Sequence, residues 1–147
     1  MATGKTAGKY TVVTVNSQVM TTMVKSITIK TDGKKIDVTT LGSGTTEHLF
    51  GLVDPEITIV CPLDNTASTG SWTVFTAAAA FASQTGVAVL IDYGIRAAAA
   101  TGDPRISETL MSVSNISFSV GGPNAAPEMS VTLSPCIGNV HSFTTKP

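Results

Sequence analysis

The stretch from Lys35 to Ile59 constrains the fold of this 147-residue chain more than any other part of it. Its pattern predicts a strand over Lys35–Thr40, a polar loop over Leu41–Asp54 and a returning strand over Glu56–Val60. Paired strands are usually joined by about two to five residues, so a loop of this length is typical of a functional or disordered segment. The fold of the rest of the chain has to accommodate this long loop between two paired strands.

Three large apolar residues, Leu49, Phe50 and Leu52, lie in the predicted loop. A loop has no core of its own in which such side chains can be buried. Our hypothesis is that they bury against another copy of the chain. The alternative is that the loop folds back onto its own domain.

Alternation of β-branched and polar residues predicts most of the remaining structure. Asp32-Gly33 separates two alternating runs and predicts a tight hairpin turn, because both turn positions favour positive φ. The alternation changes phase near Ser114-Asn115, which predicts a bulge or a bend there. Strands are predicted over Tyr10–Val15, Val24–Thr31, Lys34–Thr40, Glu56–Leu63, Val87–Tyr93, Ile106–Val120 and Glu128–Ser134, with Val140–Thr145 as a last strand or an extended tail.

One helix is predicted at about residues 72–85, in a segment rich in alanine. Ser71 can cap its free amides and Gly86 can end it. Trp72 and Phe75 recur at helical spacing, so we expect one face of the helix to pack on a sheet.

These elements predict a mainly β fold, an antiparallel β-sandwich or barrel with one flanking α-helix. We expect an N-terminal arm over residues 1–9 and a single domain over residues 10–147. Residues 1–9 lack the apolar core of a signal peptide, and no apolar run approaches the length of a membrane span. We therefore expect synthesis in the cytosol and no membrane partner.

Charged residues make up 13% of the sequence, and the formal net charge is -1. Soluble domains usually carry about 25% charged residues, so this composition favours faces that neighbours cover in an assembly. The charge balance argues against a dedicated nucleic-acid-binding protein. The lysines of the first quarter form either a solvated face or a positive edge that docks on the next subunit. These lysines are Lys5, Lys9, Lys25, Lys30, Lys34 and Lys35.

Motifs for catalysis or metal binding are missing from the sequence. His48 and His141 have no second His or Cys at ligand spacing, so we interpret both as surface residues. Cys61 and Cys136 lie in apolar, strand-like segments, which favours buried free thiols. No nucleophile elbow or phosphate-binding loop is present. We therefore predict no enzyme activity, no cofactor and no metal site.

Two groups of segments follow one another in a particular order. The first group is a strand leading into Ile36–Ser43, then Gly51–Asp54, then a strand over Ile57–Val60. The second group, near the C-terminus, is an alternating strand over Val113–Val120, a turn, and a second alternating strand over Glu128–Ser134.

Over about residues 24–140, this order resembles the tail tube (major tail) proteins of long-tailed bacteriophages. The resemblance implies a β-sandwich with a flanking helix, whose subunits close into hexameric rings. The rings stack into a hollow tube through which the genome leaves the capsid. The implied partners are other copies of the chain, other tail proteins and passing DNA that is not bound by sequence. The implied location is the virion tail, after synthesis in the host cytoplasm.

In such proteins the loop after the first hairpin and the terminal arms commonly mediate contacts between subunits and rings. A DNA conduit is often lined with acidic side chains, whereas the predicted strands over residues 24–40 carry lysines. Either these lysines face a neighbouring subunit, or the lumen is lined by other residues such as Asp37 and Glu128. The candidates for contacts between subunits or rings are Leu41, Glu47, His48, Leu49, Phe50, Leu52, Asp54, Lys5 and Lys9.

Two other functions stay open on the sequence alone. A capsid decoration protein, or another structural protein of the virion, would also be β-rich and oligomeric, but it would bind a shell and line no channel. A carbohydrate-binding β-sandwich would need aromatic side chains to stack on a sugar. The chain offers only Trp72, Tyr10 and Tyr93, and Trp72 belongs to the predicted helix face.

Overall fold

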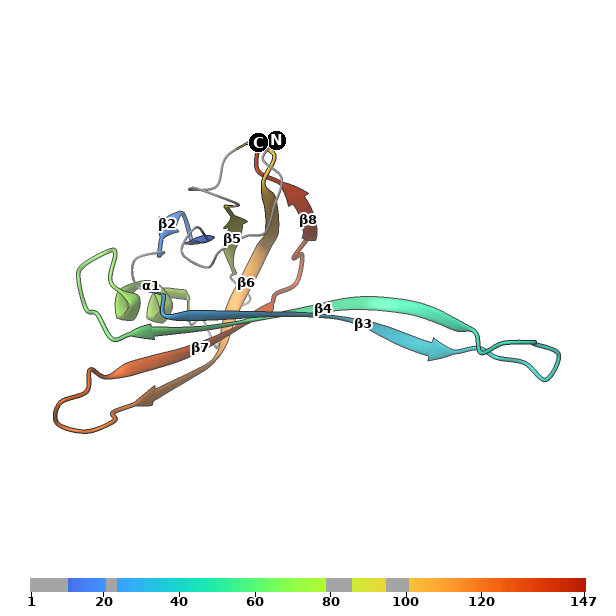
Figure 1. The fold of residues 1–147 in the computed structure, drawn as a ribbon, viewed down its shortest axis with the longest axis horizontal. Coiled ribbons are helices and arrows are strands. Elements are labelled where there is room, and N and C mark those ends of the chain that lie inside the picture. The colour runs from blue at the N-terminus through green and yellow to red at the C-terminus, as the bar shows by residue number, and fades with distance from the viewer. Residues whose placement is uncertain (1–10, 21–23, 79–85, 95–100) are drawn as a thin grey trace.

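A computed structural model of the protein describes residues 11–20, 24–78, 86–94 and 101–147. The predicted N-terminal arm, with Lys5 and Lys9, lies outside these residues. Figure 1 shows the arrangement of the elements. They are β1 (Thr11–Val15), β2 (Gln18–Val19), β3 (Ser26–Asp37), β4 (His48–Pro62), α1 (Ser71–Ala78), β5 (Val87–Tyr93), β6 (Pro104–Ser119), β7 (Glu128–Pro135) and β8 (His141–Thr145).

The strands form one antiparallel sheet in the order β2-β1-β5-β6-β7-β4-β3, with β8 paired to β6 beside this path. β6 joins the two halves of the sheet, because its first part pairs with β5 and β8 and its second part pairs with β7. The sheet is not closed into a barrel. The predicted mainly β, antiparallel fold with one flanking helix is confirmed.

One hydrophobic core connects the two halves of the sheet and the helix. Along β4, buried Ile57, Ile59 and Cys61 alternate with the partly exposed Thr58 and Val60, so one side of the strand faces the core. The open sheet therefore bends around a shared core, as the layers of a sandwich do. The buried members of the core are Val13, Val15, Met20, Ile57, Ile59, Cys61, Val74, Phe75, Val89, Ile91, Met111, Val113, Met129, Val131 and Leu133.

Two local predictions on β6 and the cysteines can be compared with this structure. The pairing of β6 with β7 shifts register between Val113 and Asn115, which confirms the predicted bulge. Cys61 is a buried free thiol, and burial raises its pKa. Cys136 is also free but is only half-buried, because it lies in the turn after β7 and not inside a strand.

α1 begins at Ser71, but this residue does not cap the helix as expected. Its hydroxyl donates to the carbonyl of Pro62 at 2.7 Å and accepts from the N–H of Asp64 at 3.0 Å. The segment before the helix folds back against it, and the N–H of Trp72 donates to the carbonyl of Asp64 at 2.9 Å. A backbone carbonyl therefore satisfies one of the helix's free amides.

The helix packs on the core with part of its predicted face. Phe75 is fully buried, whereas Trp72 is 43% exposed and contacts the ring of Phe118 with centroids 5.6 Å apart. The described part of the helix ends at Ala78, so residues 79–85 of the predicted helix lie outside the described residues.

The predicted turn at Asp32-Gly33 is wrong, because both residues lie inside the single long strand β3. Asp32 pairs with Asp54 and Gly33 pairs with Val53 of β4. Gly33 does not adopt a positive φ, which a tight two-residue hairpin turn requires. Pairing with β4 along the whole of β3 overrides the local turn preference.

The predicted loop over Leu41–Asp54 is also wrong in its extent. β4 starts at His48, so the connection between β3 and β4 covers only residues 38–47. Leu49 pairs with Ile36 and Phe50 pairs with Lys35, which makes the apolar residues part of a strand. Residues 48–53 (HLFGLV) do not alternate between polar and apolar, so they show no strand pattern in the sequence.

Candidate assembly surface

β3 and β4 continue past the rest of the sheet as a two-stranded ribbon. β4 pairs with β7 only over Ile57–Pro62, whereas it pairs with β3 out to His48. We call residues 31–55 the arm. Figure 1 shows the arm projecting far from the body of the molecule, with the loop 38–47 at its tip. Two-stranded hairpins are marginally stable at best in water, so this geometry favours a partner that covers the arm.

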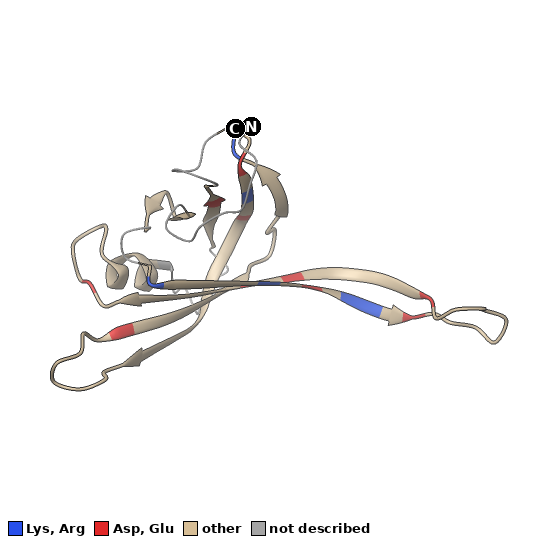
Figure 2. Cartoon of the chain, viewed as in Figure 1, with Lys and Arg blue, Asp and Glu red and all other residues tan. Residues whose placement is uncertain are grey.

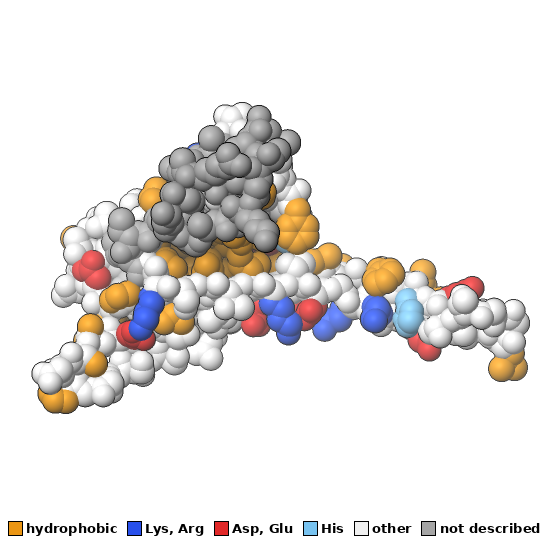
Figure 3. All heavy atoms as spheres, viewed as in Figure 1, with side chains coloured by type: hydrophobic (Ala, Val, Ile, Leu, Met, Phe, Trp, Pro, Cys, Tyr) orange, Lys and Arg blue, Asp and Glu red, His pale blue; other side chains and the backbone are white. Residues whose placement is uncertain are grey.

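The apolar side chains of the arm are exposed to solvent. Phe50 is 75% exposed and Leu52 is 85% exposed, and Leu49 is also exposed. These residues do not pack back onto the described part of their own domain, as the alternative interpretation required. Figure 3 shows most charged side chains of the arm along one long side, with hydrophobic side chains on the other side and at the tip.

A bulge changes the direction of side chains along the arm. Gly33 pairs with Val53 and Lys35 pairs with Phe50, so β4 has one more residue than β3 between these two pairs. One extra residue moves the following side chains of that strand to the other face. The bulge, at Gly51 and its neighbour, therefore puts Phe50 on the same face of the ribbon as Val53.

The tip of the arm is a loop ordered by its own hydrogen bonds. The N–H of Val38 donates to the carbonyl of Glu47 at 3.0 Å, and the N–H of Glu47 donates to the hydroxyl of Thr39 at 2.9 Å. The Asp37 carboxylate accepts from the N–H of Thr39 at 2.9 Å, and hydrogen bonding to Thr39 lowers the pKa of Asp37. Leu41 projects from this loop and is fully exposed. The tip is thus a defined shape that carries the side chain of Leu41 into solvent.

An apolar groove of about 680 Å³ lies between the root of the arm and the turn that joins β7 to β8. Leu52, Val53 and Pro55 line one wall, and residues 135–141 line the other. Ile137 in the second wall is itself exposed. The groove brings together segments that are about 80 residues apart in the chain.

A buried polar cluster fixes the second wall of the groove onto β6. The side chain of Glu108 is only 1% exposed, and its carboxylate accepts from Nδ2 of Asn139 at 2.8 Å and contacts Nδ1 of His141. Asn139 also accepts from the N–H of Leu110 at 2.8 Å. A buried carboxylate requires such partners to offset its lost hydration.

The prediction of a surface position is wrong for His141, whose side chain is only 13% exposed, while His48 is exposed on the arm. Sequence reasoning also missed Glu108 and Asn139. The only local signal is an acidic residue within the predicted strand over Ile106–Val120. Its partners become visible only through the pairing of β6 with β8.

The half of the sheet formed by β3, β4, β7 and the end of β6 has an outer face, opposite the core, that is dominated by hydroxyl side chains. Thr58 pairs with Thr28 on one side and Thr132 on the other, and the hydroxyls of Ser134 and Ser114 bond at 2.9 Å. We call this surface the hydroxyl face. Its serines and threonines are Ser26, Thr28, Thr58, Ser112, Ser114, Ser117, Ser119, Ser130, Thr132 and Ser134.

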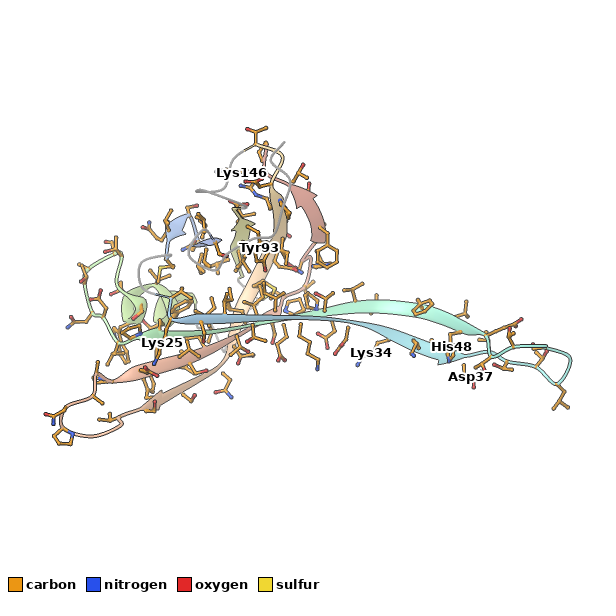
Figure 4. The ribbon with its side chains drawn as sticks, viewed as in Figure 1. Lys25, Lys34, Asp37, His48, Tyr93 and Lys146 are labelled. Atoms are coloured by element: carbon orange, nitrogen blue, oxygen red, sulfur yellow. The ribbon has the colours of Figure 1, made fainter. Side chains whose placement is uncertain are left out.

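The structure gathers most of the predicted contact residues on the arm, while the two predicted lumen residues lie far apart. Asp37 is at the far end of β3, and Glu128 is at the start of β7, paired with Pro62. Glu128 forms an ion pair with Lys25, with Nζ and Oε1 2.5 Å apart. Figure 4 shows Asp37 and Lys25 at opposite ends of β3. The predicted contact residues on the arm are Leu41, Glu47, His48, Leu49, Phe50, Leu52 and Asp54.

Residues 11–20, 24–78, 86–94 and 101–147 contain no group of three or more His, Cys, Asp or Glu side chains that could hold a metal ion. No helix in the same ranges is long and apolar enough to cross a membrane.

The fold is that of tail tube proteins of phage-like particles. A chain of the virion of a native gene transfer agent particle superimposes with a TM-score of 0.69 at 15% identity, over 94% of this chain and 98% of that one. The SPP1 tail tube gives a TM-score of 0.69 at 8% identity, over 96% and 81%. The tail of an empty gene transfer agent particle, solved with C6 symmetry, gives 0.58 at 17% identity, over 83% and 82%. No family model and no curated protein matches the sequence.

Proposed function

We propose that the chain is the structural subunit of a virion tail tube and assembles into stacked hexameric rings that conduct the genome. The arm is the observation that carries this proposal. It is a two-stranded ribbon with exposed Phe50 and Leu52, and in water it needs a partner. The shared fold, and the C6 symmetry of one similar tail, support a ring of six as that partner. Localisation in the virion tail and contact with other tail proteins follow from the same proposal.

In this proposal the arm forms the contact between subunits or rings. The outer half of the arm carries the contact residues Leu41, Glu47, His48, Leu49 and Phe50. Leu52 and Asp54 lie nearer the root of the arm. Lys5 and Lys9 remain proposed contacts of the N-terminal segment.

The hydroxyl face is the proposed lumen surface. Small hydroxyl side chains keep a surface wet, whereas an interface core is depleted of serine and of charge. Glu128 lies on this face, because it alternates with the buried Met129. Asp37 stays a proposed lumen residue at the outer end of β3.

Substituting Phe50→Asp tests the role of the arm. A charge in place of an apolar contact should prevent polymerisation, because it would be buried without a partner between subunits. Negative-stain electron microscopy of the purified chain, with and without tail initiators, should show tubes for the unchanged chain and none for Phe50→Asp. Circular dichroism should show the same β content for both.

Val19→Asp is the matched control, because Val19 is exposed on β2, away from the arm. This variant should still form tubes. Tube formation by the Phe50→Asp variant would show that the arm does not form the contact between subunits or rings. A monodisperse monomer of the unchanged chain at high concentration with initiators, or trimers on empty capsids, would contradict the tail tube itself.

A further inference from the structure

Two lysines of β3, Lys30 and Lys34, lie on the hydroxyl face together with a larger number of carboxylates. Lys30 pairs across the ribbon with Glu56, and Asp32 pairs with Asp54, so all four side chains share one face of the ribbon. Alternation along β3 puts Lys34 on this face as well. Figure 2 shows basic and acidic residues interleaved along β3 and β4.

Two lysines at this face are held directly by acids, Lys30 of β3 and Lys25 just before it. Nζ of Lys30 lies 3.1 Å from Oδ2 of Asp32, and Nζ of Lys25 lies 2.5 Å from Oε1 of Glu128. The pKa of Lys30 is raised, first by its hydrogen bond to Asp32 and also by the charges of Glu56 and Asp54. The lysine-rich first quarter is thus balanced by Asp32 within it and by acids that come from later in the chain.

We propose that Glu128 and Asp32 act as masks that keep Lys25 and Lys30 from binding the phosphates of duplex DNA. The proposal rests on the proposed function, because it assigns this face a polyanion that moves past it. DNA affinity of a surface comes chiefly from lysines and arginines that neutralise phosphates and release counterions. A lysine that already has a carboxylate partner gains little by exchanging it for a phosphate, and the neighbouring acids repel the phosphate.

The position of these pairs on the surface supports a role in recognition more than in stability. Lys25 and Lys30 are both largely exposed, and exposed ion pairs contribute little to the free energy of folding. The local charge persists even when an exposed pair opens, because the face carries Asp32, Asp54, Glu56 and Glu128 against Lys25, Lys30 and Lys34. The surface therefore offers duplex DNA a hydrated, slightly acidic track that does not retain it.

The double variant Asp32→Asn/Glu128→Gln removes both masks and leaves all lysines in place. Binding of a fluorescent DNA duplex to the unpolymerised full-length chain is measured by anisotropy at about 50 mM salt, a concentration at which phosphate contacts are strong. The unchanged chain should give no saturating binding, and the double variant should bind at least about tenfold more tightly. Two unmasked lysines predict a slope of about −2 in a plot of log affinity against log salt concentration.

Two further variants decide between masking and a general effect of charge. Glu47→Gln/Asp64→Asn changes the net charge equally but lies off the hydroxyl face, at the tip of the arm and in the segment before α1. It should not bind DNA. Adding Lys25→Gln and Lys30→Gln to the Asp32→Asn/Glu128→Gln double variant should abolish the DNA binding that this variant gained.

The proposal is overturned if the off-face variant gains as much affinity as the double variant, or if the unchanged chain already binds as tightly. Light scattering and electron microscopy on the same preparations report assembly separately. If the unchanged chain forms tubes but the double variant gains no affinity for DNA, the masking proposal is contradicted and the proposed function is not. A chain that forms no tubes under any condition contradicts the proposed function.

Discussion

At the scale of single residues, Glu108 is a buried acidic side chain whose lost hydration has to be offset by hydrogen-bond partners. Its carboxylate is buried, and Asn139 and His141 supply its partners from the turn after β7 and from β8. Asn139 does this while also accepting the N–H of Leu110. One amide side chain therefore joins a buried charge to the backbone N–H of Leu110, which lies where the pairing of β5 with β6 shifts register.

Asn139→Ala should lower the free energy of unfolding by about 1–3 kcal/mol, because it leaves a buried carboxylate oxygen and a backbone N–H without partners. Urea unfolding of the unpolymerised chain, followed by circular dichroism, measures this change. Asn65→Ala at an exposed loop position should stay within about 0.5 kcal/mol of the unchanged chain. An equal effect of both substitutions would show that the buried cluster adds no stability.

At the scale of elements, sequence reasoning succeeded where a strand has one buried face. β7 and the end of β6 were predicted nearly in place, because apolar residues alternate there with serine and threonine, and β5 was predicted from its short, largely apolar run. Prediction failed on the outer parts of β3 and β4, where both faces of the ribbon are wet beyond residue 31, so the period of two carries no signal.

The candidate site divides in the same way. The sequence identified Leu49, Phe50 and Leu52 as apolar residues without a core, and the structure shows them exposed on the arm. It could not identify the groove or the Glu108 cluster, because both depend on register between strands that are about 30 to 80 residues apart in the chain. Long-range pairing of this kind has no local signature.

Inserting one glycine after Lys34 tests the bulge in the arm. The insertion gives β3 an extra residue opposite Gly51, so the bulge is no longer needed and Phe50 turns to the face opposite Val53. We expect tube formation to be lost with little change in circular dichroism.

Insertion of one glycine after Gly44 in the tip loop is the control, because it lengthens the connection without changing the register of β3 and β4. Electron microscopy should still show tubes for this variant. If both insertion variants assemble equally well, the orientation of Phe50 does not matter for assembly.

At the scale of the whole molecule, the chain divides into a body with a core and an arm without one. Over Ile57–Val60, β4 is hydrogen-bonded to β3 on one side and to β7 on the other. Residues 31–55, in contrast, form a ribbon of two strands only. Local stability follows burial and contact density, so the two parts should open with different free energies.

Amide hydrogen exchange should report this difference directly. In the unpolymerised chain, amides of residues 31–55 should exchange fast and those of residues 57–61 should exchange slowly. In assembled tubes both segments should exchange slowly, because neighbours cover the arm. Slow exchange of the arm in the unpolymerised chain would show that the ribbon is stable without a partner.

The open edges of the arm also create a competition during synthesis. Until another copy covers them, the outward N–H and C=O groups of β3 and β4 can pair with any extended segment, including the arm of a misaligned copy. Irregular aggregation is then favoured by high protein concentration, and ordered growth is favoured by an early nucleus of the right geometry. In the proposed tail tube, the timing of that nucleus would matter as much as the affinity between subunits for the yield of assembled protein.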